Sequence, residues 1–318
     1  MTCEAVNKIK KCIIVQIPTV LCLGFAVTMI LMADRLRGEI YNGFLFSFTT
    51  VIPTLFPFFI LSDLWSALYS INPKGFLSRN FERLFGIRGC AFSALISGYF
   101  CGFPVGAKVA SQLYTERKIT KDELERLIGF TNNPSLAFVV SGVGAGMLGN
   151  IFYGLILYFS IILSSMLTGI IFRRASENIS EACDNSRQSF NLIDSIKSAG
   201  LNSLNVASCI VFFSGVLGLI SGMVKNEGIL LSFSVLCEVT NAIKLAVKSP
   251  TLSLELKLII SAFALGFSGL SVHLQAFSFI PSDVSKIRYF IMKLTQGFIA
   301  SIFIFILIRS GIFKVLSH

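Results

Sequence analysis

Charged residues are scarce in this chain. Asp, Glu, Lys and Arg make up 14% of its 318 residues, whereas 54% are hydrophobic, and the mean hydropathy is +0.76. Soluble globular domains carry about 25% charged residues. The composition therefore excludes an ordinary soluble domain and indicates an integral membrane protein that crosses the bilayer several times.

The motifs of several enzyme and metal-site classes are also absent. The chain has only two histidines, His273 and His318, and contains no G-x-S-x-G, H-E-x-x-H or C-x-x-C sequence. Ser271 and His273 are two residues apart, so a helix directs them to different faces. We therefore expect no enzyme, no metal site and no cofactor. We also expect the eight cysteines to be small buried residues without a framework of disulfide bonds.

The net charge of +10 does not indicate a nucleic-acid partner, because Lys and Arg form short clusters between apolar runs and not one basic face. Such clusters orient membrane proteins, since cytoplasmic loops are enriched in Lys and Arg. A cytoplasmic N-terminus places more Lys and Arg inside than outside. We expect a multi-pass protein of the cell membrane, in contact with lipid.

Apolar runs of about 20 residues predict the membrane spans. Two shorter runs, 90–111 and 229–247, carry polar or helix-breaking residues in their middle and predict re-entrant hairpins. After the first hairpin, Thr120 and Glu123 form the pattern of a helix capping box. The longer runs predict seven crossings, at 12–32, 48–70, 127–147, 150–172, 204–224, 258–280 and 287–308.

Polar and helix-breaking residues interrupt four of these segments. The first hairpin holds Gly102–Pro104 and Lys108, and the span after it holds Thr131–Pro134. The second hairpin holds Glu238–Asn241, and the span after it holds Ser268–Ser271. In lipid, a broken helix survives only where protein or a polar cavity surrounds it. The breaks therefore predict a binding site at membrane depth.

The order of span, hairpin, span and span occurs twice, in opposite directions. This order predicts an inverted repeat with a site at the repeat interface. We divide the chain into an N-terminal span with its connector (1–42), a first repeat (43–174), a polar cytoplasmic linker (175–202) and a second, inverted repeat (203–318).

Five motifs in this order resemble the nucleoside-recognition (Gate) domain family. They are LFPFF at 55–59, SG with FPVGAK at 97–108, FTNNP at 130–134, EVTN at 238–241 and GFSGLSVHLQ at 266–275. They look most like the sporulation integral membrane proteins of that family. The resemblance implies the all-α fold of concentrative nucleoside transporters, with about seven transmembrane helices and two re-entrant hairpins. It also implies transport of dipicolinic acid towards the forespore, in the membrane derived from the mother cell.

The candidate substrate-binding residues lie at the four breaks. Lys108 would attract an anionic substrate, or it snorkels to the surface. Glu238 and His273 are candidates for coupling transport to H⁺ or Na⁺, and a structural role is the alternative for both. The other candidates share polarity or an unusual backbone: Gly102, Phe103, Pro104, Gly106, Thr131, Asn132, Asn133, Thr240, Asn241, Ser268, Ser271 and Gln275.

Transport of a small anionic metabolite by alternating access is the function that these residues favour. Nucleosides and other carboxylates are alternative cargoes. An alternative of a different class is a membrane scaffold for spore development that transports nothing, which would need no polar residues at matched depths in the membrane. The sequence is compatible with a homo-oligomer.

Overall fold

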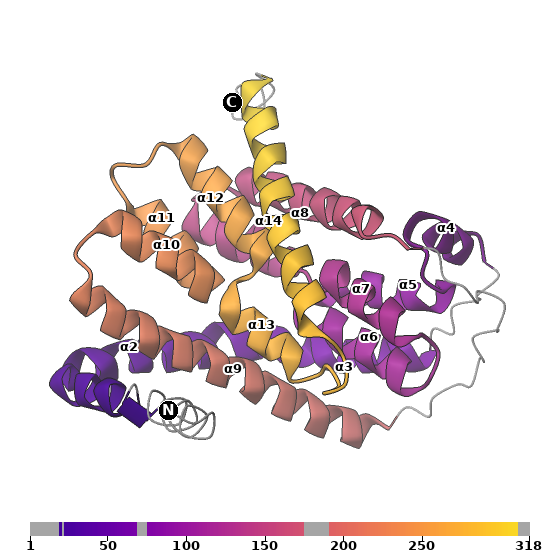
Figure 1. Cartoon of the computed structure of the whole chain (residues 1–318), viewed down its shortest axis with the longest axis horizontal. Coiled ribbons are helices and arrows are strands. Elements are labelled where there is room, and N and C mark those ends of the chain that lie inside the picture. Colours follow the sequence, from indigo (N-terminus) through magenta and orange to yellow (C-terminus); the bar gives the residue numbers. More distant parts are fainter. Residues whose placement is uncertain (1–18, 21, 69–74, 175–190, 311–318) are drawn as a thin grey trace, which may run out of the picture.

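The computed structural model describes residues 19–20, 22–68, 75–174 and 191–310 of the chain (Figure 1). All regular secondary structure in these ranges is helical, which confirms the all-α class. The first half contains α2 (Ala33–Phe46), the π-helical segment η1 (Ser47–Val51), α3 (Ile52–Leu68), α4 (Phe76–Phe85), η2 (Gly89–Ala91), α5 (Phe92–Cys101), α6 (Val105–Thr115), α7 (Lys121–Thr131), the π-helix η3 (Phe138–Met147) and α8 (Ile151–Ile171). The second half contains α9 (Leu192–Met223), α10 (Glu227–Cys237), α11 (Val239–Lys248), α12 (Leu254–Phe267), α13 (Gly269–Phe277) and α14 (Lys286–Arg309).

Four helical segments in the described part of the chain are long and apolar enough to cross a membrane: α8, α9, the α12–α13 pair and α14. Two bent pairs, α2–η1 with part of α3 and α4 with η2–α5, raise this number to as many as six. The structure thus supports four to six spans where the sequence predicts about seven. The predicted first span, 12–32, lies partly outside the described residues, and the inverted relation of the two halves stays a prediction.

Two local features differ from the sequence predictions. Helix α9 begins at Leu192, inside the range assigned to the linker, because the Asn191 side chain caps it by accepting a hydrogen bond from the Ile193 N–H at 3.0 Å. Cys90 forms a disulfide bond, although no disulfide framework is expected from the sequence. The other cysteines in the described ranges, Cys22, Cys101, Cys209 and Cys237, are free.

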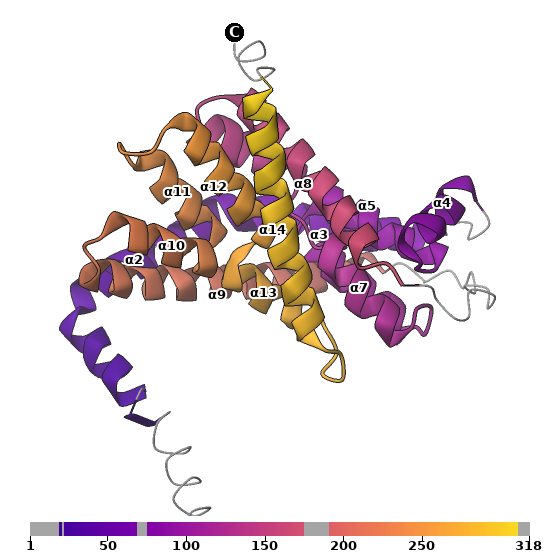
Figure 2. The ribbon, with the colours of Figure 1, turned by 45° about the horizontal axis from the view of Figure 1, so that its top comes forward.

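Helix α14 holds the two halves of the chain together. It stands upright across the long axis of the molecule and packs against α7 and α8 of the first half and α12 of the second (Figures 1 and 2). At the crossing of α12 and α14, a Cβ on Gly266 would lie 2.8 Å from the Gly297 Cα. The two helix backbones therefore touch, as small residues allow in membrane proteins.

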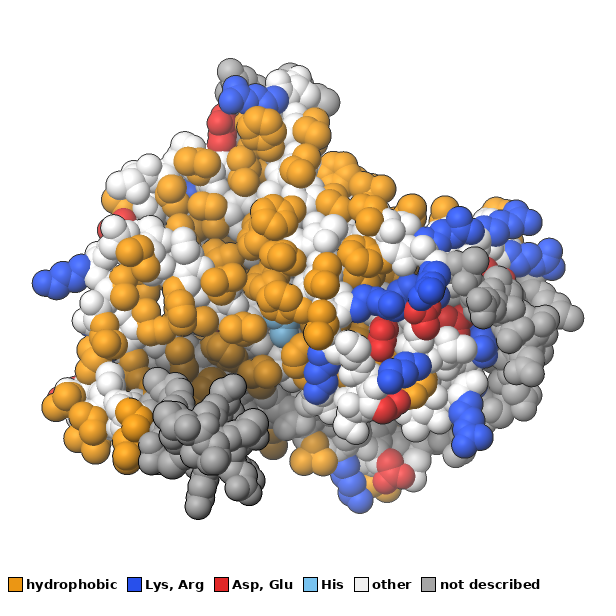
Figure 3. Space-filling model, viewed as in Figure 1, with side chains coloured by type: hydrophobic (Ala, Val, Ile, Leu, Met, Phe, Trp, Pro, Cys, Tyr) orange, Lys and Arg blue, Asp and Glu red, His pale blue; other side chains and the backbone are white. Residues whose placement is uncertain are grey.

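The surface separates an apolar face from a charged end (Figure 3). Large hydrophobic side chains of α14 such as Phe298, Ile302 and Phe305 are exposed, as expected for contact with lipid. At the charged end, the predicted capping box of Thr120 and Glu123 is present at the start of α7. The adjacent Asp122 accepts hydrogen bonds from Arg126 at 3.0 Å and from Arg288 of α14 at 2.7 Å. This end therefore also ties α7 to α14.

The contact between Gly266 and Gly297 generates a prediction about stability. Gly266→Ala should lower the free energy of unfolding by about 1–3 kcal/mol, because the added methyl group has no space at the helix crossing. Gly200→Ala is the matched control, since nothing lies within 4 Å of a Cβ at Gly200 in α9. That change should be neutral or raise stability by up to about 1 kcal/mol. Thermal unfolding of the purified protein in detergent measures both, and equal effects of the two changes would contradict the close crossing.

Candidate functional site

The first pair of breaks is held together by contacts that only glycine permits. A Cβ on Gly98 of α5 or on Gly106 of α6 would overlap the Thr131 carbonyl oxygen at the end of α7. At the tip of the hairpin, a Cβ on Gly102 would lie 2.6 Å from the Ser135 nitrogen. The α5–α6 hairpin is therefore seated directly on the break between α7 and η3.

The second pair of breaks is joined in a similar way. Ser268 and Gly269 adopt positive φ angles of 76° and 70° between α12 and α13. A Cβ on Gly269 would lie 3.2 Å from the carbonyl group of Cys237 and from the Glu238 nitrogen, at the tip of the α10–α11 hairpin. In both halves of the chain, then, the hairpin tip lies against the broken helix that follows it in sequence.

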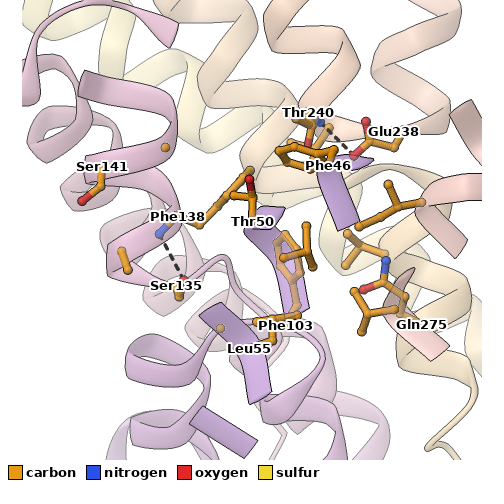
Figure 4. A pocket seen from close by; sticks show the side chains of 18 residues that line it. Phe46, Thr50, Leu55, Phe103, Ser135, Phe138, Ser141, Glu238, Thr240 and Gln275 are labelled. Atoms are coloured by element: carbon orange, nitrogen blue, oxygen red, sulfur yellow. Dashed lines mark hydrogen bonds between the residues drawn. The ribbon is translucent and has the colours of Figure 1, made fainter. Parts of the chain in front are cut away.

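Both hairpin tips reach one cavity of about 360 Å³. Gly102 and Phe103 come from the first tip, and Glu238 and Thr240 come from the second. Figure 4 shows Phe103, Glu238 and Thr240 around the cavity. Gln275 of α13 completes the predicted residues in its wall. Further side chains that the sequence analysis does not single out also line it, namely Phe46, Thr50, Ser135, Phe138 and Ser141.

Glu238 is the only ionisable residue among the described residues that line this cavity. Its side chain is 3% exposed and caps α11, accepting hydrogen bonds from the Thr240 N–H at 3.0 Å and the Asn241 N–H at 2.7 Å. A carboxylate is favourable here because the N-terminus of a helix carries partial positive charge. The position thus accounts for a buried acid and leaves it facing the cavity.

Gln275 offers an unused acceptor in the same wall. Its Nε2 donates to the Ser271 Oγ at 3.3 Å, whereas its Oε1 is buried and has no hydrogen-bond partner in the described part of the chain. A buried unpaired acceptor is costly. A donor group on a bound molecule would satisfy this oxygen.

A buried polar network lies on the α14 side of the break after α7. Lys293 is fully buried, and its Nζ donates to the Asn132 carbonyl oxygen at 2.9 Å and to the Gln296 Oε1 at 2.8 Å. Gln296 Nε2 donates to the Asn133 Oδ1 at 2.7 Å. Asn132 Nδ2 donates to the Tyr289 hydroxyl at 2.9 Å. This network supplies the partners that the broken helix lacks.

His273 belongs to this network and does not line the cavity. Its Nδ1 lies 3.3 Å from the Tyr289 hydroxyl, and its ring packs edge-on against Phe267 and Tyr289. Its Nε2 has no partner within the described ranges. The structure therefore places this coupling candidate behind the cavity, among aromatic rings.

Lys108 lies away from the cavity and is neutralised locally. Its Nζ forms an ion pair with Asp63 of α3 at 2.6 Å, and the second oxygen of Asp63 accepts a hydrogen bond from Ser195 of α9 at 3.0 Å. Lys108 of the first hairpin thus pairs with Asp63 and not with Glu238 of the second hairpin. The pair ties α6 to α3.

The remaining predicted residues surround the cavity without lining it. Asn241 instead lines a neighbouring cavity. The others stand at the hairpin tips and helix breaks behind the wall: Pro104, Gly106, Thr131, Asn132, Asn133, Ser268 and Ser271. Tyr289, Lys293 and Gln296 are the polar residues that sequence reasoning missed. A lysine and a glutamine one helical turn apart in the apolar run 287–308 were the available signal.

These features define a helical integral membrane protein whose broken segments meet around an internal cavity. The chain is similar to the sporulation integral membrane protein YlbJ of Bacillus subtilis (strain 168), with 29% identity over 301 residues, covering 81% of this chain and 74% of that protein. This similarity supports a relationship to YlbJ-type proteins. No family model matches the chain, so the wider resemblance to the Gate domain stays a prediction, and no solved structure matches it.

The buried network predicts a strong coupling between two residues. Gln296→Leu should lower the free energy of unfolding by about 1–3 kcal/mol, because it removes one of the two acceptors of the Lys293 ammonium and the donor to the Asn133 amide oxygen. The double variant Lys293→Met with Gln296→Leu should be more stable than the sum of the two single changes indicates, because the ammonium is then gone. Thermal unfolding in detergent measures the cycle.

Thr295→Val on the same helix is the control for this cycle, since among the described residues the Thr295 hydroxyl bonds only to the Ile291 carbonyl oxygen of α14 itself. Additive effects of Lys293→Met and Gln296→Leu would show that the two side chains do not act as a unit.

Proposed function

We propose that this protein transports a small anionic metabolite across a membrane by alternating access, with dipicolinic acid during endospore formation as the specific cargo. The observation that carries the proposal is the meeting of two hairpin tips and two broken helices at one cavity of about 360 Å³. Small-molecule sites have volumes of about 300–1,000 Å³. Broken helices at a cavity are typical of transporter sites.

The similarity to a protein named for sporulation and for the membrane supports the biological setting. In this setting the chain lies in the cell membrane, in the part derived from the mother cell, with a cytoplasmic N-terminus. Its partners are the cargo and the surrounding lipid. On this proposal it is a transporter and catalyses no reaction.

The aromatic side chains in the wall suit an aromatic acid. The rings of Phe103 and Phe138 lie 6.3 Å apart, edge to face, and Phe46 lines the same cavity. Such rings bind a planar molecule through apolar contact. The unpaired Gln275 Oε1 would accept a hydrogen bond from a protonated carboxyl group of the cargo.

Charge sets the condition for binding an anion here. Glu238 is the only ionisable side chain among the described lining residues, and it would repel a carboxylate at low dielectric constant. We therefore propose that a cation accompanies the cargo, either a proton carried by Glu238 or a sodium ion close to it. Cation-coupled transport of an anion offsets this repulsion.

The lining of this cavity also favours a second candidate cargo. A wall of aromatic and neutral polar side chains with one carboxylate also suits an uncharged nucleoside, whose hydroxyl and base N–H groups could donate to Glu238 and Gln275. Nucleoside transport is thus the alternative that the cavity supports.

The proposal is tested by uptake into liposomes that contain the purified protein. Dipicolinate, nucleosides and other carboxylates are compared under imposed H⁺ and Na⁺ gradients. Dipicolinate should accumulate, and its uptake should depend on one of the two gradients. Saturable nucleoside uptake without dipicolinate uptake would support the alternative, and no flux of any compound would overturn transport in favour of a scaffold.

Glu238→Gln tests the coupling role. The amide oxygen of Gln can still accept a hydrogen bond from a backbone N–H in the first turn of α11, but the side chain can no longer bind a proton or attract Na⁺. Uptake should lose its dependence on the ion gradient. Glu227→Gln, at the exposed start of α10 in the same hairpin, should leave this dependence unchanged. Ion-dependent uptake by Glu238→Gln would show that this residue does not couple transport.

A further inference from the structure

A second cavity of about 580 Å³ lies beside the first, between α2, α9, α10 and α11. Phe46 lines both cavities, so its ring forms part of the wall between them. We call the second cavity the vestibule. Its polar wall differs in charge from that of the first, and it contains Glu39, Asn42, Ser214, Ser234, Lys244 and Lys248.

The vestibule carries an excess of positive charge. Lys244 and Lys248 are four residues apart on α11, so they share one helix face. Neither forms an ion pair with a carboxylate of the described residues within the 4.0 Å limit. Glu39 is the only acidic residue in the described wall, which leaves two lysines against one carboxylate. An anion would find here the cationic side chains that the first cavity lacks.

A second observation points to a bound molecule. The Ser234 side chain faces the vestibule and is fully buried in the fold. Its Oγ has no hydrogen-bond partner in the part of the chain that the structure describes. A hydroxyl in a polar cavity with two lysines is a suitable donor to a carboxylate oxygen. The unpaired Ser234 hydroxyl and the ammonium groups of Lys244 and Lys248 would thus all bind the same kind of ligand, a carboxylate.

Lys244 also contacts the wall between the cavities. Its Nζ lies 4.5 Å from the centre of the Phe46 ring, a cation–π distance. Lys244 is half-buried, and a carboxylate that bound it would form a charge-assisted hydrogen bond in place of the ring contact. Binding would therefore draw the ammonium group away from the ring and release Phe46.

We propose that the vestibule is a recruitment site for carboxylate anions on the path to the inner cavity, with the contact between Lys244 and Phe46 as the partition. The inference rests on the proposed function, because it needs an anionic cargo. Beyond the proposed function, it assigns Lys244 and Lys248 to a binding step before the cargo reaches Glu238. Lys244 and Lys248 attract the anion, Ser234 donates to it, and Phe46 moves when Lys244 is engaged.

The experiment measures initial rates of dipicolinate uptake by the full-length protein in vesicles of zwitterionic lipid, at low and high salt. The double variant Lys244→Gln with Lys248→Gln should raise the half-saturating concentration by about ten-fold at low salt, because a positively lined cleft concentrates anions. The maximal rate should change little. The salt dependence of the half-saturating concentration should flatten, since salt screens the attraction that the wild type uses.

Four further variants separate an effect of charge from an effect on folding. Lys244→Arg keeps the charge and should keep the half-saturating concentration of the wild type. Glu39→Gln removes the opposing carboxylate and should lower the half-saturating concentration. Lys225→Gln is the matched control, because this exposed lysine follows the end of α9 but does not line the vestibule. Because Lys248 is exposed, Lys248→Gln alone still tests the idea if the double variant does not fold.

The outcomes are distinct. If the wild type takes up dipicolinate and the lysine variants keep its half-saturating concentration and salt dependence, the vestibule does not recruit the anion, and the proposal of transport still stands. An equal effect of Lys225→Gln would show that the overall surface charge sets the half-saturating concentration, which also overturns the recruitment role of the vestibule. If the wild type takes up no carboxylate under any gradient, the proposed function and the vestibule fail together.

Discussion

The unpaired backbone at the helix breaks is the constraint on which the rest of the structure depends. A helix that ends at membrane depth leaves N–H or C=O groups that water cannot satisfy. At the start of α11, the Glu238 carboxylate accepts two backbone N–H groups. At the end of α7, the Lys293 ammonium donates to the Asn132 carbonyl oxygen. The chain thus uses a negative group at a helix N-terminus and a positive group at a helix C-terminus, as the helix dipole favours.

This arrangement explains why α14 joins the two halves. Its side chains Tyr289, Lys293 and Gln296 reach Asn132 and Asn133 of the first half, while its Gly297 touches Gly266 of the second half. Polar side chains on α14 therefore form hydrogen bonds with the break after α7, and the same helix packs closely against α12. The exposed apolar face of α14 remains free for lipid.

The breaks could be predicted from sequence because their causes are local. Gly102, Pro104 and Pro134 interrupt helices through their own backbone chemistry. The partners of the breaks could not be predicted in this way. Lys108 and Lys293 both stand in apolar segments, but one pairs with Asp63 and the other with the Asn132 carbonyl oxygen. These partners lie 45 and 161 residues away in sequence, and only the packing of the helices decides between them.

The ionisable groups divide into those that face a cavity and those that are enclosed behind it. The Lys293 ammonium is enclosed by acceptors and does not line the cavity, so it serves the break. His273 is likewise enclosed, against Tyr289 and Phe267. Glu238 faces the cavity while it caps α11, and Lys244 faces the vestibule on the same helix. Under the proposed function, an anion therefore passes along α11 from a positive region to a negative one. Such a step is favourable only when the charge of Glu238 is neutralised, so coupling to a cation follows from the order of these residues on one helix.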